Sequence, residues 1–117
     1  GSLFIWKKFF HKDSRIIGID LNPDAKKLEK FGFEIFIGNQ SNKSFWDEFY
    51  SKVGNIDIIL DDGGHKNIQQ ISTVDNSINK INNGGLIVVE DVHSSFIKWY
   101  YNPSKNSFIN FFEVLLQ

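Results

Sequence analysis

Four short apolar runs, each followed by polar residues, place the strongest constraint on the fold of this chain. They are rich in Ile, Val and Phe and cover residues 15–20, 33–38, 56–60 and 86–89. They alternate with segments whose apolar residues recur at three- and four-residue steps, which is the pattern of amphipathic helices. Strands that are apolar almost throughout are typical of a parallel sheet covered by helices on both faces. The sequence therefore predicts an α/β fold with a mostly parallel sheet.

Helical spacing and capping residues predict helices over residues 3–11, 23–30, 44–53 and 68–81. The last of these has an apolar stripe that consists of Ile68, Ile71, Val74, Ile78 and Ile81, and it is expected to stop at residues 82–85. Residues 93–105 have little periodicity and predict a loop. The apolar segment 108–116 predicts a helix or a strand.

Composition limits the partners and the chemistry. The 117 residues suit about one domain, and 13 Lys and Arg against 14 Asp and Glu leave a net charge of −1. We therefore expect no nucleic acid and no membrane as a partner. The chain has no Cys, so a metal site would use His, Asp, Glu or Asn. A chain without cysteines has no disulfides, which is compatible with the cytoplasmic location that we expect. No apolar stretch approaches the roughly 18–20 residues of a membrane span.

Polar residues gather where the predicted strands end, at Asp20, Asn39-Gln40, Asp61-Asp62 and Glu90-Asp91. In an open parallel sheet, ligands bind outside the carboxyl ends of the strands. Asp20 stands where nucleotide-binding folds place an acid on ribose hydroxyls, although a turn or capping aspartate would look the same. Asn39 and Gln40 could read an adenine edge or lie in a polar loop.

The segment Asp61-Asp62-Gly63-Gly64-His65 is the most informative. Two carboxylates and a histidine directly follow an apolar strand, and the two glycines between them add almost no side-chain bulk. Adjacent like charges favour a cation or compensating hydrogen bonds, so the segment indicates a metal site or a general acid or base. An exposed turn with solvated charges is the alternative. Glu90-Asp91 repeats the pattern one strand later. If the two strands are neighbours, up to four carboxylates converge and suit Mg²⁺, Mn²⁺ or Ca²⁺.

Together, four segments resemble class I S-adenosylmethionine-dependent methyltransferases. They are residues 18–20 (GID), 37–41 (IGNQS), 61–65 (DDGGH) and 84–94 (GGLIVVEDVHS). The combination is most similar to the metal-dependent, mycinamicin-type O-methyltransferases that act on sugars of macrolides. The resemblance implies a Rossmann-like, doubly wound fold, with S-adenosyl-L-methionine and Mg²⁺ or another divalent cation as cofactors. It also implies a small-molecule, carbohydrate-containing substrate that is methylated on a hydroxyl.

The resemblance also assigns roles to individual residues. His65 would be the general base, and Asp62, Glu90 and Asp91 would hold the metal ion. The cofactor would be bound by Gly1, Ser2, Asp20, Asn39, Gln40 and Asp61. Methyl transfer from a sulfonium needs a positioned, partly deprotonated hydroxyl, which a cation beside an imidazole supplies.

Some features depart from the pattern of this family. Gly64 stands where Ser is usual, and Asn39 stands where Asp is usual. The first strand, its glycine-rich loop and the antiparallel closing strands are missing, and only Gly1-Ser2-Leu3 resembles the tail of that loop. We therefore expect residues 1–117 to be a partial methyltransferase domain, incomplete at the N-terminus and at the C-terminus, that is part of a longer protein or a fragment that survives proteolysis. Alone, it is expected to bind cofactor weakly or not at all.

Two other classes of function fit parts of the sequence. A nicotinamide-dependent Rossmann oxidoreductase (NAD type) would use Asp20 for the same ribose hydroxyls, but it gives the acidic strand ends no purpose. A non-catalytic α/β domain for binding or assembly would join its open edges to another copy, as a homo-oligomer.

The aromatic residues Phe96, Trp99, Tyr100 and Tyr101 could stack on a sugar ring or cover the core.

Overall fold

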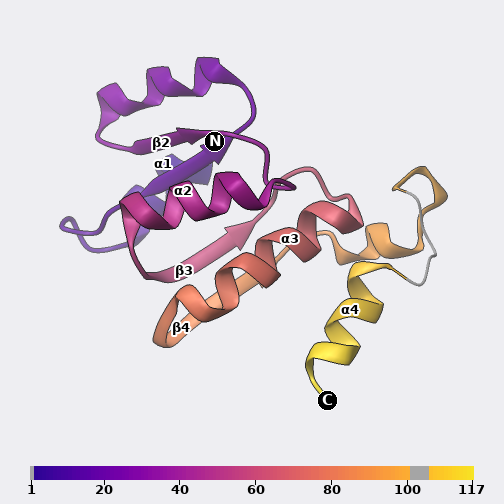
Figure 1. The fold of residues 1–117 in the computed structure, drawn as a ribbon. Helices are drawn as coiled ribbons and strands as arrows, with labels where there is room; N and C mark the ends of the chain where they lie inside the picture. Colours follow the sequence, from indigo (N-terminus) through magenta and orange to yellow (C-terminus); the bar gives the residue numbers. More distant parts are fainter. Residues whose placement is uncertain (1, 101–105) are drawn as a thin grey trace. The chain divides into compact units, whose positions relative to one another are not determined.

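The structure, a computed structural model, describes residues 2–100 and 106–117 (Figure 1). The predictions made for Gly1 and Tyr101 lie outside the described residues. The chain divides into two compact units, unit 1 (Gly1–Asn39) and unit 2 (Gln40–Gln117). Of the described helices, none is long and apolar enough to cross a membrane.

Unit 1 contains two parallel strands and two helical segments. In chain order they are α1 (Ser2–Phe9), β1 (Ile17–Asp20), the 3-10 helix η1 (Pro23–Phe31) and β2 (Glu34–Ile37). β1 pairs with β2 in parallel, with Asp20 opposite Ile37, and η1 packs on β2. The predicted strands are therefore confirmed, and the second predicted helix forms as a 3-10 helix.

The residues at both ends of η1 explain where it starts and stops. Asn22 is the N-cap, and its side chain accepts a hydrogen bond from the backbone N–H of Asp24. Pro23 opens the helix, where its missing N–H costs nothing. At the other end Gly32 is left-handed, with φ 88°, and its N–H donates to the carbonyl of Glu29. Because residues with a Cβ rarely adopt this conformation, Gly32 ends the helix and leads the chain into β2.

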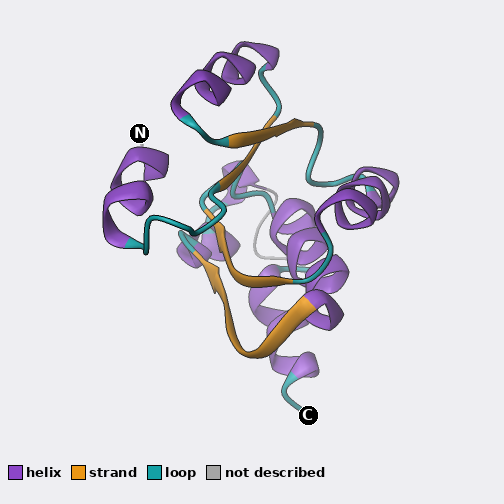
Figure 2. Ribbon diagram, turned by 90° about the vertical axis from the view of Figure 1, so that its left-hand side faces the viewer, coloured by secondary structure: helices purple, strands orange, loops and turns teal. Residues whose placement is uncertain are grey.

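Unit 2 contains the second pair of parallel strands (Figure 2). In chain order its elements are α2 (Lys43–Val53), β3 (Ile56–Asp61), α3 (Asn67–Ser77), η2 (Ile78–Lys80), β4 (Ile81–Val89), η3 (Val92–Phe96), η4 (Lys98–Tyr100) and α4 (Phe108–Leu115). β3 and β4 pair with Asp61 opposite Val89. α3 packs against α2, β4 and α4.

β4 begins earlier than the sequence predicts. Ile81 already pairs with Ile56, and residues 82–85 bulge out before the ladder resumes at Leu86. Gly84 has φ 81° in this bulge, a conformation that glycine adopts at little cost. The segment that resembles a helix stop is therefore a bulge within a strand, and the preceding helix is shorter than predicted.

The buried face of α3 also differs from the predicted apolar stripe. Ile68 and Ile78 are 61% and 41% exposed, whereas Val74 is buried. Polar residues form the rest of the buried face, and they are Asn67, Gln70, Ser72, Thr73 and Ser77. Buried polar groups are retained where they find hydrogen-bond partners, and this face bonds to the side chain of Gln40 and to the loop that follows β4.

Each unit has one two-stranded parallel sheet, and the predicted parallel α/β fold is confirmed. Cover on both faces, which we expected, is not complete for the β3–β4 pair among the described residues. Ile58, Leu86 and Val88 are 45%, 57% and 41% exposed on it. In the described part of the predicted loop, up to residue 100, the chain forms two short 3-10 turns, η3 and η4, and residues 101–105 lie outside the described residues. The helical alternative for residues 108–116 is confirmed by α4.

α2 supplies the centre of the core of unit 2. Trp46, Phe49 and Tyr50 are buried in it, and the Tyr50 hydroxyl donates to Ser77 Oγ at 2.6 Å. Burial raises the pKa of the Tyr50 hydroxyl, so the neutral, hydrogen-bonded form is the one that the folded chain favours. This bond fastens α2 to the C-terminal end of α3.

We expect Tyr50→Phe to lower the free energy of unfolding of unit 2 by about 1–2 kcal/mol, because it leaves the buried Ser77 hydroxyl without this partner. Urea denaturation followed by circular dichroism measures the change. Tyr100→Phe, in the half-buried η4 turn, is the matched control and should change little. Equal losses for the two variants would contradict the assignment.

A two-pronged ion pair links Arg15 to Glu34 in unit 1. Both nitrogen–oxygen distances are 2.8 Å, and the hydrogen bond from Arg15 lowers the pKa of the Glu34 carboxyl. The two side chains are 55% and 42% exposed. Solvent therefore screens the pair, which we expect to contribute about 0.2–1 kcal/mol.

This contribution is present above the carboxyl pKa of the unfolded chain, about 4.3, and is lost as the pH falls through the lower pKa of folded Glu34. Glu34→Gln should therefore lower the stability of unit 1 near neutral pH and flatten its loss in acid. Amide exchange of β1 and β2 measured from pH 3 to pH 7 tests this, with Glu113→Gln in α4 as control. An unchanged acid profile in Glu34→Gln would contradict the prediction.

Candidate functional site

The loop after β3 is folded tightly around the side chain of Gln40. The Gln40 amide nitrogen donates to both carboxylate oxygens of Asp61, at 3.2 and 3.0 Å, and to Thr73 Oγ1 at 3.1 Å. Its oxygen accepts from the N–H of Gly64 at 3.2 Å. Asp61 is only 6% exposed and also accepts from the N–H of Gly63 at 3.0 Å. These bonds fix the loop from its buried side.

The two glycines of this loop are required by the close approach of glutamine side chains. A Cβ at Gly63 would collide with the amide of Gln40, and a Cβ at Gly64 would collide with the amide of Gln69. The Gln69 oxygen accepts from the N–H of Lys66 at 3.1 Å and closes the capping box of α3, so moving this side chain aside would break the cap. The glycines therefore make room for side chains of this same chain.

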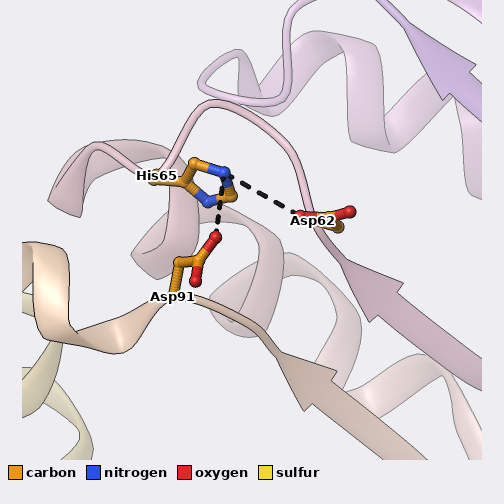
Figure 3. Close-up of side chains that lie close together, drawn as sticks. All are labelled: Asp62, His65 and Asp91. Atoms are coloured by element: carbon orange, nitrogen blue, oxygen red, sulfur yellow. Dashed lines mark ion pairs between the residues drawn. The ribbon is translucent and has the colours of Figure 1, made fainter.

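His65 follows the glycines and faces two carboxylates (Figure 3). Its Nε2 lies 3.8 Å from Asp62 Oδ1 and 3.4 Å from Asp91 Oδ2. The side chain of His65 is 23% exposed, and those of Asp62 and Asp91 are 52% and 48% exposed. The other ring nitrogen, Nδ1, is buried and has no hydrogen-bond partner among the described residues. Nε2 is therefore the ring nitrogen that faces the half-exposed carboxylates of Asp62 and Asp91.

The loop after β4 brings Asp91 to this place. The N–H of Glu90 donates to the carbonyl of Asp61 at 2.9 Å, so the pairing of β3 with β4 continues to the start of both loops. The chain then turns sharply, because Asp91 is left-handed with φ 54°. His93 Nδ1 lies 3.7 Å from the other oxygen of Asp91.

Asp62, His65 and Asp91 form a cluster that could hold a metal ion. One ligand atom from each lies within 4.8 Å of the others, and the two carboxylates offer the oxygen atoms that hard divalent cations prefer. The half-exposed position leaves room for water to complete a coordination sphere. Glu90, also predicted as a metal ligand, is exposed and is not one of the three residues of this cluster.

The predicted cofactor residues of unit 1 lie at the ends of its strands. Asp20 is exposed at the end of β1, and its Oδ1 accepts from the N–H of Asn22 at 2.8 Å, so it also forms the turn that we considered as the alternative. Asn39 follows β2 and is exposed. Ser2 is exposed at the start of α1. In unit 2, the predicted cofactor residues Gln40 and Asp61 bond each other.

The sequence alone did not predict that Gln70, or Ser94 at the end of the segment 84–94, is buried and supports the cluster. Gln70 is 0% exposed and Ser94 is 1% exposed, and each donates to a backbone carbonyl beside the cluster. The helical spacing of Asn67, Gln70, Val74 and Ser77 was the available signal. It went unused because polar residues in a helix normally mark the solvent side.

Comparison with known proteins gives a consistent set of relatives, although no family model matches. The chain is 31% identical to demethylmacrocin O-methyltransferase of Streptomyces fradiae over 96 residues, which are 82% of this chain and 24% of the relative. It is 30% identical to mycinamicin VI 2''-O-methyltransferase of Micromonospora griseorubida over the same share of both chains. The chain thus spans about a quarter of the length of the curated relatives it matches.

Solved structures give the same result for the fold. The MycE methyltransferase of the mycinamycin biosynthetic pathway, in complex with Mg, SAH and mycinamycin VI, matches with a TM-score of 0.89 at 23% identity. The match covers 98% of this chain and 31% of that one. The chain therefore has part of the Rossmann-like α/β fold of this methyltransferase, and the predicted resemblance to the mycinamicin-type O-methyltransferases is confirmed.

Proposed function

We propose that residues 1–117 are a partial class I methyltransferase domain, which binds S-adenosyl-L-methionine and a divalent cation for O-methylation of a sugar or a glycosylated small molecule. The observation that carries the proposal is the cluster of Asp62, His65 and Asp91 at the carboxyl ends of β3 and β4. It occurs in a chain whose relatives are named O-methyltransferases, one of them the 2'-O-methyltransferase of a rhamnosyl tetracenomycin. Ligands of open parallel sheets bind at this edge.

Asp62 and Asp91 would hold the cation, with Glu90 from the same loop as a further carboxylate. The donor set fits Mg²⁺, because it consists of carboxylate oxygens and is open to water. When bound, the cation would lower the pKa of an acceptor hydroxyl. The two carboxylates come from segments that are fixed by the β3–β4 pairing, so they would fix the position of that hydroxyl as well.

His65 would accept the proton of the acceptor hydroxyl at Nε2, the nitrogen that faces the carboxylates. S-adenosyl-L-methionine, when bound, would supply the methyl group to the hydroxyl oxygen and would leave as S-adenosylhomocysteine. The proton of the hydroxyl passes to Nε2, and Asp91 stabilises the imidazolium that results. The neighbouring aspartates thus serve both the cation and the base.

Asp20 and Asn39 would bind the nucleoside part of the cofactor, since both are exposed at strand ends, and Ser2 would contribute from the start of α1. Gly1 belongs to this proposal but lies outside the described residues. Gln40 and Asp61 already bond each other, so contacts of these side chains with the cofactor would compete with those hydrogen bonds. Carboxylates that accept from ribose hydroxyls are the usual device in such folds.

S-adenosylhomocysteine is expected to bind the chain weakly, and Asp20→Ala should weaken the binding by about tenfold or more, since a hydrogen bond to a charged group contributes about 1.5–3 kcal/mol. Calorimetric titration with and without Mg²⁺ measures this. Asp13→Ala, an exposed aspartate of unit 1, is the control. A folded chain that takes up neither ligand and forms a dimer would instead support the assembly alternative.

Mn²⁺, a spectroscopic substitute for Mg²⁺, is expected to bind at the cluster. Asp62→Asn and Asp91→Asn should each weaken Mn²⁺ binding by at least about tenfold, because each removes a charged oxygen ligand. Electron paramagnetic resonance of free Mn²⁺ gives the affinity. Asp75→Asn, an exposed aspartate of α3, should leave it unchanged, and a loss of the same size in this control would refute a local site.

A further inference from the structure

Gln70 and Ser94 are two buried side chains that donate hydrogen bonds to backbone carbonyls in the two loops that carry the cluster of Asp62, His65 and Asp91. Gln70 Nε2 donates to the carbonyl of Glu90 at 3.0 Å. Ser94 Oγ donates to the carbonyl of His65 at 2.8 Å. The two side chains are 0% and 1% exposed. Neither belongs to the cluster, so any effect on the cluster must pass through the backbone that they hold.

The backbone at these two places is unusual. Among the described residues, the non-glycine residues with positive φ are His65, at 56°, and Asp91, at 54°. Left-handed conformation is sparsely populated by residues with a Cβ, and it persists where the surrounding structure holds it. Both residues belong to the cluster. The positions of its imidazole and of one carboxylate therefore depend on two unfavourable backbone conformations.

Each buried hydrogen bond acts on one of these conformations. Ser94 holds the carbonyl of His65 itself. Gln70 holds the carbonyl of Glu90, which shares a rigid peptide plane with the N–H of Asp91. The N–H of Glu90 is held by the carbonyl of Asp61 at the end of β3. The chain thus enters Asp91 in a direction that is fixed by a strand on one side and by α3 on the other.

We propose that Gln70 and Ser94 are positioning residues, which hold Asp91 and His65 left-handed and thereby set the arrangement of Asp62, His65 and Asp91 for a divalent cation. This inference rests on the proposed function, because it concerns the same cluster. It differs from a general contribution to stability, since any buried hydrogen bond contributes to folding. Only hydrogen bonds that orient the side chains of the cluster also change its affinity for a cation.

The first test compares Mn²⁺ affinities of the full chain, measured by electron paramagnetic resonance, for Ser94→Ala, Gln70→Leu and the control Ser77→Ala. Ser77 is also 0% exposed and accepts a buried hydrogen bond from Tyr50, but it is not adjacent to the cluster in sequence. Loss of residues that orient metal ligands typically weakens metal binding about 10- to 100-fold. We expect such a loss for Ser94→Ala and Gln70→Leu, and less than about a twofold change for Ser77→Ala.

If Ser94→Ala does not fold, Ser94→Cys supplies the same information, because it keeps the volume and is only a weak donor. Urea denaturation of every variant separates a loss of stability from a loss of affinity. Equal Mn²⁺ affinities in the Ser94, Gln70 and Ser77 variants would overturn the inference, whatever their stabilities.

A second test needs no metal. In the isotope-labelled, metal-free chain, the HN–Hα coupling and the Cα chemical shift of His65 and Asp91 distinguish left-handed from other backbone conformations. We expect left-handed values in the unsubstituted chain, a change at His65 in Ser94→Ala and a change at Asp91 in Gln70→Leu. Retention of left-handed values in both variants would overturn the inference. Failure of the unsubstituted chain to bind Mn²⁺, with these changes present, would count against the proposed function alone.

Discussion

The parallel pairing of β3 with β4 is the constraint on which the candidate site depends. Asp61 lies opposite Val89, and the hydrogen bond from the N–H of Glu90 to the carbonyl of Asp61 extends the ladder by one residue. The two acidic loops therefore start at the same edge of the sheet. A slip of one residue would turn the side chains of one strand to the opposite face. Apolar strands that carry no chemistry thus decide where the carboxylates lie.

The depth of the cluster suits a site that exchanges a cation with solvent. Asp62 and Asp91 are about half exposed, at 52% and 48%, so water screens their mutual repulsion. Full burial of two carboxylates would favour protonation over metal binding. His65 is less exposed, at 23%, and its position places the imidazole at the inner side of the cluster. Carboxylates that meet water and a base that is shielded from it are suited to different tasks.

The sequence predicted the parts of the fold and site that depend on local patterns. Asp62 and Asp91 follow the ends of two strands, and the alternation of strands and helices predicts parallel strands. If these strands are neighbours, the two carboxylates are expected to meet at one edge of the sheet. The buried, supporting roles of Gln70 and Ser94 were not predicted, because a polar residue in a helix or a loop has the same local signal whether it is buried or exposed. The sequence pattern of residues 82–85 predicts a helix stop instead of a bulge, since glycines occur both at helix ends and in strand bulges. In each case a partner distant in sequence decides the outcome, namely Glu90, His65 and β3.

Gly64 shows how a departure from the family pattern can be absorbed locally. The family usually has Ser at this position, and a Cβ here would collide with the amide of Gln69. That amide is held in place by the capping box of α3, where Gln69 accepts from the N–H of Lys66. The helix cap and the glycine are therefore matched to each other. Since the same loop leads directly into left-handed His65, the glycine and the cap immediately precede the residue whose imidazole faces the two carboxylates of the cluster.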